Sequence, residues 1–145
     1  MAFCHRRLVH PHDDGVWLGN VAALENLPAG VDAVVSLCRV NEEDLPAGVE
    51  QIDVRLIDDV DPDANPNLDF MLIDTVRLIE QLRREGRTVL LHCAACKSRT
   101  PTVAALYGAV RQGVSGELAL QAIIEAIPDA LPNNEFSKAI KRLAP

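Results

Sequence analysis

The sequence VLLHCAACKSRTP, residues 89–101, decides how this chain is organised. Its apolar start has the composition of a strand buried on both faces, and this strand ends at His92. The segment after Arg99 has its apolar residues at helical spacing, with Pro101 near the first turn. Cys93 therefore lies between the end of a strand and the start of a helix. There, free backbone N–H groups and the positive end of the helix dipole favour the nucleophilic thiolate form of cysteine.

Five residues separate Cys93 from Arg99. The small side chains at positions 94, 95 and 98 allow these residues to curl into one turn, whose N–H groups then form an anion-binding nest. Arg99 adds a planar fork that holds two oxygens of a phosphate group. A sulfur at the floor of this nest is placed to attack a phosphate ester and form a cysteinyl-phosphate. The predicted phosphate-binding residues are Ala94, Ala95, Cys96, Lys97, Ser98 and Arg99.

Two residues that flank this loop are predicted to tune the sulfur. His92 is expected to fix the loop through hydrogen bonds. Thr100 has two candidate roles, since its hydroxyl can cap the following helix or donate to the sulfur when thiolate leaves. Both roles of Thr100 stay open at this point.

The rest of the chain predicts an α/β domain. Strands are expected over residues 16–20, 31–38, 51–57 and 88–92. A helix is expected from Leu68 to Leu82, with Asn65 as its N-cap and Pro66 at its first position. Later helices are expected after Arg99, after Ser115, and after Asn133 or Asn134. Strands come early and helices late, which predicts a three-layer fold with a mostly parallel central sheet of four to five strands flanked by helices. Ligands bind at the carboxyl ends of such strands, where residues 92–99 fall.

Length and charge set limits on what the chain does. Its 145 residues are enough for one domain, which we place at residues 15–145 after a flexible N-terminal tail at residues 1–14. The net charge of −7 argues against a nucleic-acid partner. No stretch approaches the roughly 20 apolar residues of a membrane helix, and the N-terminus has no apolar signal core, so we expect a cytoplasmic protein without a membrane partner.

The segment His92-Cys93-x5-Arg99-Thr100 resembles the signature of the cysteine-dependent protein tyrosine phosphatases, in particular their compact dual-specificity branch. The resemblance extends to VWLGN at 16–20, AVVSLC at 33–38 and LPNNEFSKAIKRL at 131–143. It implies a phosphatase fold and hydrolysis of phosphate monoesters through a cysteinyl-phosphate, without metal or cofactor. The implied partner is a phosphorylated protein or another phosphomonoester, with phosphotyrosine the first choice and phosphoserine or phosphothreonine the alternative.

The resemblance also implies an aspartate that protonates the leaving group and later assists water. The loop after the third predicted strand offers four aspartates. Asp58 follows the end of this strand, whereas Asp61 is closer when counted back from Leu68. Asp58 is our first choice and Asp61 the second. The four candidates are Asp58, Asp59, Asp61 and Asp63.

Cys96 stands where the family usually has glycine, and this leaves two alternatives open. A left-handed backbone there would be strained by ~1 kcal/mol, so one alternative is a phosphate-binding module without turnover. The Cys93-x-x-Cys96 spacing makes Cys96 a redox candidate, which could trap oxidised Cys93 as a disulfide or act in a dithiol oxidoreductase. A thioredoxin-like fold would need strands after this helix, and residues 103–145 predict only helices. A zinc site would need further ligands from Cys4, His5, His10 and His12, so no metal is predicted.

Overall fold

The computed structural model describes residues 7–145 as one mixed sheet covered by helices. The strands are β1 (Arg7–His10), β2 (Asp13–Gly19), β3 (Val31–Ser36), β4 (Glu50–Asp53) and β5 (Thr88–His92). The α-helices are α1 (Leu68–Arg84), α2 (Arg99–Gln112), α3 (Gly116–Ala126) and α4 (Asn134–Leu143). Two short 3-10 helices are η1 (Val21–Glu25) and η2 (Glu42–Asp44). The predicted α/β class and mostly parallel sheet of four to five strands are confirmed.

The sheet has the strand order β1-β2-β5-β3-β4, and all neighbours run parallel except β1 and β2. The middle strand, β5, therefore has parallel partners on both sides, as expected from its continuous apolar run. His92, its last residue, is in register with Gly19 of β2 and Ser36 of β3. The loop that follows His92 thus starts at the carboxyl edge of three adjacent strands.

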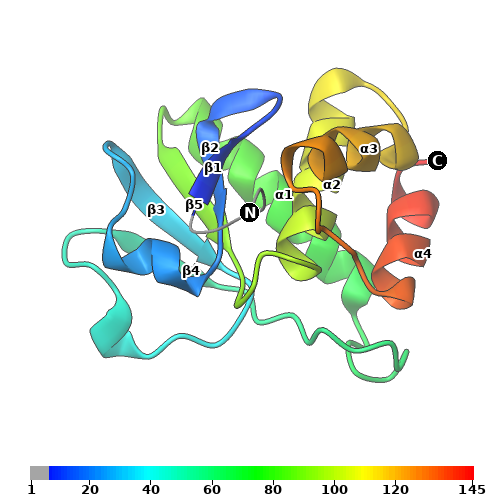
Figure 1. The fold of residues 1–145 in the computed structure, drawn as a ribbon, viewed down its shortest axis with the longest axis horizontal. Helices are drawn as coiled ribbons and strands as arrows, with labels where there is room; N and C mark the ends of the chain where they lie inside the picture. The colour runs from blue at the N-terminus through cyan, green and yellow to red at the C-terminus, as the bar shows by residue number, and fades with distance from the viewer. Residues whose placement is uncertain (1–6) are drawn as a thin grey trace.

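The four α-helices lie on one side of the sheet (Figure 1). Helix α2 is in the middle of this layer, and its residues 100–109 are all buried. Ala23 and Leu24 of η1 belong to a second apolar cluster with Val34 and Leu90, so η1 covers part of the opposite face. The loop between β5 and α2 is therefore anchored at both ends in the protein core. None of the helices within residues 7–145 combines the length and the apolar composition needed to cross a bilayer.

The sheet begins earlier than the sequence predicts, because residues 7–14 form β1 and the start of β2. Two of the polar residues that suggested a tail, His10 and Asp13, are buried and paired. His10 Nε2 lies 2.9 Å from the carbonyl oxygen of Ala104 in α2. Asp13 accepts hydrogen bonds from Tyr107 Oη at 2.6 Å and Arg83 Nε at 3.1 Å. The remainder of the predicted tail, residues 1–6, lies outside the described residues.

The connection between β4 and α1 also differs from its prediction. Strand β4 ends at Asp53, and Arg55 has a left-handed φ of 55°, which breaks the extended run predicted to reach residue 57. Asn67, not Asn65, is the N-cap of α1. Asn65 instead pairs with the backbone of Ile57, accepting from its N–H at 2.9 Å and donating to its carbonyl at 2.7 Å. An asparagine that holds a loop in this way has the same local sequence as a helix cap.

Candidate active site

The loop from Cys93 to Ser98 turns back over the Cys93 sulfur. The backbone N–H of Cys96 donates to Cys93 Sγ at 3.2 Å. Cys93 is a free thiol and only 2% exposed, whereas Ala94, Ala95 and Lys97 are exposed. The predicted curl of the loop around the sulfur is therefore present.

Neighbouring segments hold this loop from outside. The carbonyl of Ala94 accepts a hydrogen bond from the N–H of Val21 at 3.2 Å, and the carbonyl of Lys97 accepts one from Leu131 at 2.7 Å. In a trans peptide group the N–H points opposite to the carbonyl. The N–H groups of Ala95 and Ser98 therefore point away from these neighbours. This orientation is the one that an anion-binding nest requires.

Unpartnered polar atoms gather around Cys93. Within residues 7–145, the buried side-chain polar atoms without a hydrogen-bond partner are His92 Nδ1, Arg99 Nε and Thr100 Oγ1. Thr100 is fully buried, and Arg99 donates from Nη1 to the carbonyl of Leu56 at 3.1 Å. Buried polar atoms are normally paired, and exceptions concentrate where function or a bound group explains them. The three atoms belong to residues that flank the loop predicted to bind phosphate.

His92 supports the loop but carries no charge near neutral pH. Its Nε2 lies 2.7 Å from Ser36 Oγ, a buried pair that joins the ends of β5 and β3. Burial lowers the pKa of His92 to about 4, and the nearby positive charge of Arg99 acts in the same direction. His92 therefore contributes hydrogen bonding to the site, and not positive charge.

Asp58 shares a cavity with the loop at residues 94–98, which is predicted to bind phosphate and is called the phosphate-binding loop below. The cavity has a volume of about 440 Å³, and its lining includes Asp58, Ala95, Lys97 and Ser98. Asp58 Oδ1 accepts a hydrogen bond from Asn133 Nδ2 at 2.7 Å. A carboxylate therefore lies in the cavity beside Ala95, Lys97 and Ser98.

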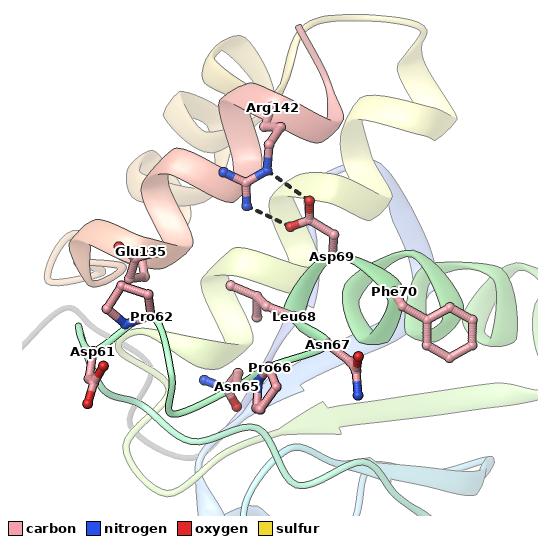
Figure 2. A pocket seen from close by; sticks show the side chains of 10 residues that line it. All are labelled: Asp61, Pro62, Asn65, Pro66, Asn67, Leu68, Asp69, Phe70, Glu135 and Arg142. Atoms are coloured by element: carbon pink, nitrogen blue, oxygen red, sulfur yellow. Dashed lines mark hydrogen bonds and ion pairs between the residues drawn. The ribbon is translucent and has the colours of Figure 1, made fainter.

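Asp61 lies in a different place, as Figure 2 shows. It lines a separate cavity of about 410 Å³ between the loop before α1, the start of α1, and α4. Its Oδ1 accepts from the backbone N–H of Asp63 at 2.9 Å, a contact within its own loop. Across this cavity the ion pair of Asp69 and Arg142 joins α1 to α4. This cavity shares no lining residue with the cavity beside the phosphate-binding loop.

Cys96 adopts the conformation that suits glycine. Its φ is 59°, in the left-handed region, and it is fully buried. The strain that the sequence predicts for a left-handed residue here therefore applies. The redox role of Cys96 stays a prediction.

The metal alternative finds no further support in the part of the chain that the structure describes. Residues 7–145 hold no group of three or more histidine, cysteine or acidic residues suited to a metal ion. Two of the four possible zinc ligands, Cys4 and His5, lie outside the described residues.

Asn133 is the site residue whose role the sequence does not reveal. It was expected only as the possible cap of the last helix, and it is the N-cap of α4. In addition it contacts both the phosphate-binding loop and Asp58, through its N–H to Ser98 Oγ at 3.0 Å and through Nδ2. Partners this far apart in sequence leave no local pattern.

The structure is an α/β domain that has a free thiol and an arginine at the two ends of the loop between β5 and α2. No family model matches the chain. It is 29% identical over 132 residues to dual specificity protein phosphatase 1 of Arabidopsis thaliana, covering 90% of this chain and 66% of that protein. It is 28% identical to a probable dual specificity protein phosphatase of Dictyostelium discoideum, covering 88% of this chain and 32% of that protein. The chain thus spans less than two thirds of the length of either relative.

Solved structures agree with these relatives. A variant of human DUSP28 superimposes with a TM-score of 0.80 at 28% identity, over 94% of this chain and 92% of that one. These relatives and solved structures all indicate the cysteine-dependent protein tyrosine phosphatase superfamily, in its compact dual-specificity branch.

Proposed function

We propose that the chain hydrolyses phosphate monoesters, as a protein tyrosine or dual-specificity phosphatase that acts through a cysteinyl-phosphate. The support comes from the relatives, which are named as dual specificity phosphatases, and from the loop around Cys93. The observation that carries the proposal is that Arg99 Nε and Thr100 Oγ1, two buried polar atoms without a hydrogen-bond partner, lie at the end of the loop that begins with this thiol.

In the first step the Cys93 thiolate attacks phosphorus, and an S–P bond forms while the P–O ester bond breaks. The departing oxygen takes the bonding electron pair and receives a proton from Asp58. The loop N–H groups and Arg99 hold the phosphoryl oxygens, and this positioning and charge stabilisation supply most of the catalysis. Asp61 remains the second candidate for the acid.

In the second step water attacks phosphorus and gives a proton to Asp58, and the S–P bond breaks. Inorganic phosphate leaves and the thiolate is restored. Thr100 Oγ1, which has no other partner, is available to donate a hydrogen bond to this leaving sulfur. The predicted phosphate-binding set is the loop at residues 94–98 together with Arg99.

The test is hydrolysis of 4-nitrophenyl phosphate in the presence of EDTA by the full chain and by Cys93→Ser. We expect turnover that EDTA does not affect, that vanadate inhibits and that Cys93→Ser abolishes. Turnover that survives Cys93→Ser would overturn the cysteinyl-phosphate, and turnover lost with EDTA would point to metal-dependent hydrolysis.

A second candidate is a phosphate-binding module without turnover. The observation that favours it is the left-handed φ of Cys96, where the family usually has glycine. Binding of phosphate or vanadate without hydrolysis of any aryl phosphate would support the module over the enzyme.

Phosphotyrosine on a protein is the substrate that we propose first, with phosphoserine and phosphothreonine second. Val60 and Leu131 are exposed and line the cavity beside the loop, so they offer apolar contacts to an aromatic ring. The net charge of −7 opposes a nucleic-acid partner. The proposed location is the cytoplasm, whose reducing conditions keep a reactive thiol free.

A further inference from the structure

Three of the hydrogen bonds of Asn133 join three parts of the site. Its backbone N–H donates to Ser98 Oγ in the phosphate-binding loop at 3.0 Å. Its side-chain Oδ1 accepts from the N–H of Phe136 at 2.9 Å, which caps α4. Its side-chain Nδ2 donates to Asp58 Oδ1 at 2.7 Å. The side chain is thus fixed at one oxygen by the helix end, and its remaining donors are aimed at the candidate acid.

The loop that carries Asp58 is held at three successive residues. Leu56 accepts from Arg99, Ile57 pairs with Asn65 through both its backbone groups, and Asp58 accepts from Asn133. The first two contacts fix the backbone of this loop. The contact with Asn133 is the one that acts on the Asp58 side chain itself.

Asp58 is exposed, so without a partner its carboxyl group would sample several rotamers. A general acid works only when its proton is within hydrogen-bond reach of the leaving oxygen. A bond from Asn133 to Oδ1 selects one rotamer and leaves Oδ2 to carry the proton towards the substrate.

We propose that Asn133 is a positioning residue for the reaction: it orients Asp58 over the phosphate-binding loop for proton transfer to the leaving group. The proposal rests on the proposed phosphatase function. In this proposal, the Asn133 side chain aligns the acid on the β4–α1 loop with the phosphate held at the start of α2.

The test compares two substrates that differ in their need for an acid. Phenyl phosphate has a poor leaving group that needs a proton, whereas 2,4-dinitrophenyl phosphate leaves readily without one. Asn133→Ser keeps a good helix cap but removes the donor to Asp58. We expect kcat/KM for phenyl phosphate to fall by about 10- to 100-fold, the scale of a misplaced catalytic group. The value for 2,4-dinitrophenyl phosphate should fall several-fold less.

A second variant, Asn133→Asp, keeps the cap and places a carboxylate against Asp58. We expect at least the same selective loss for phenyl phosphate. The matched control is Asn67→Ser, because Asn67 is the N-cap of α1 and makes no side-chain cap bond. This control should lower neither rate by more than about 2-fold, as expected of a surface substitution that removes no contact.

A double-mutant cycle decides whether Asn133 acts through Asp58. In the Asp58→Asn background, Asn133→Ser should cause no further loss with phenyl phosphate. An equal loss with both substrates, or a full additional loss in the Asp58→Asn background, would overturn the proposal and leave a purely structural role. These outcomes differ from failure of the proposed function, in which the unmodified chain shows no Cys93-dependent hydrolysis of either substrate.

Discussion

Cys96 combines a left-handed backbone with a β-carbon that this conformation disfavours. A pair of variants isolates the cost, because Cys96→Ala and Cys96→Gly both remove the sulfur and differ only in the β-carbon. At an ordinary position glycine is the less stable of the two by about 0.5–1 kcal/mol. Left-handed strain of about 1–2 kcal/mol reverses this order. We therefore expect Cys96→Gly to be more stable than Cys96→Ala by about 1 kcal/mol in urea unfolding with reductant.

The sign of this difference is the result that matters. If Cys96→Ala proves as stable as Cys96→Gly or more so, the loop is not strained at this residue. The alternative of a module disabled by Cys96 would then lose its physical basis.

His92 makes the stability of the fold depend on pH. Its pKa is about 4 in the folded chain, against 6.5 for an ordinary histidine. Between these values the unfolded chain binds a proton that the folded chain does not, so stability falls as the pH drops below about 6.5. We expect the free energy of unfolding to be about 2 kcal/mol lower at about pH 5 than at about pH 7 because of His92 alone.

Urea unfolding of the unmodified chain and of His92→Gln at both pH values measures this contribution. The variant should lose less stability than the unmodified chain over the same interval. Burial also lowers the pKa of His10, but this residue is present in both proteins, so it does not contribute to the difference. Equal losses in the two proteins would contradict the prediction.

At the scale of single residues, the sequence predicted the features that depend on neighbours along the chain. The turn around Cys93 and the placement of Arg99 follow from small residues and spacing over seven positions. Ser115, the N-cap of α3, was also predicted as the start of a helix, because a cap depends on residues next to it in the sequence. The second role of Asn133 could not be predicted, because its partner Asp58 is 75 residues away and any exposed polar residue is compatible with the pattern.

Among the elements, the loop between β4 and α1 decides which aspartate can serve as the acid. Its first part is tied to the phosphate-binding loop and α4, whereas Asp61 contacts its own loop and a separate cavity. We expect Asp58→Asn to lower kcat/KM for phenyl phosphate by about 100-fold, the lower range for loss of a general acid. Asp61→Asn is the matched control, and it should change the rate by less than about 3-fold, in the range of an exposed loop substitution.

Steady-state hydrolysis of phenyl phosphate by the two variants checks this order. A larger loss in Asp61→Asn than in Asp58→Asn would transfer the acid role to Asp61. It would also mean that the loop rearranges when substrate binds.

In the same loop, the predicted start of α1 was wrong. Asn65 and Pro66 have the residue types of a helix start, yet α1 starts at Leu68 and Asn65 holds the backbone of Ile57. Local sequence favours both arrangements, and a long-range packing requirement selects one of them. The rest of α1 was predicted from its helical periodicity alone, without knowledge of long-range packing.

On the scale of the whole molecule, a negatively charged protein carries the site that we propose for a doubly negative ligand. In the proposed site, Arg99, Lys97 and the inward-facing N–H groups of the loop offset the net charge of −7 locally. An oxyanion that binds only the folded chain must stabilise it by mass action. Tungstate at about 100 times its Kd should add about 2.7 kcal/mol and raise the Tm by about 5–10 °C.

Thermal unfolding with and without tungstate measures this shift. Arg99→Met is the control variant, because it removes the fork and keeps a long side chain. It should lose most of the shift. An unmodified chain whose Tm does not respond to tungstate or to phosphate would contradict the anion site itself.

Whole-molecule topology was predicted except at the sheet edge. The buried runs of β3 and β5 identified the parallel core, but β1 was missed because His10 and Asp13 looked like solvent-exposed residues. Both are buried against α2, where Ala104 and Tyr107 pair with them. Polar residues whose partners come from a distant helix cannot be distinguished from a tail by composition.

The position of Asn133 in the chain has a consequence for biosynthesis. A ribosome makes the nucleophile and its arginine first, and the residue that aligns the proton donor emerges only afterwards, at the start of α4. A nascent polypeptide that stops short of this helix lacks Asn133 and also the core residues Phe136 and Ile140. We therefore expect hydrolysis to appear late in translation, once α4 has docked.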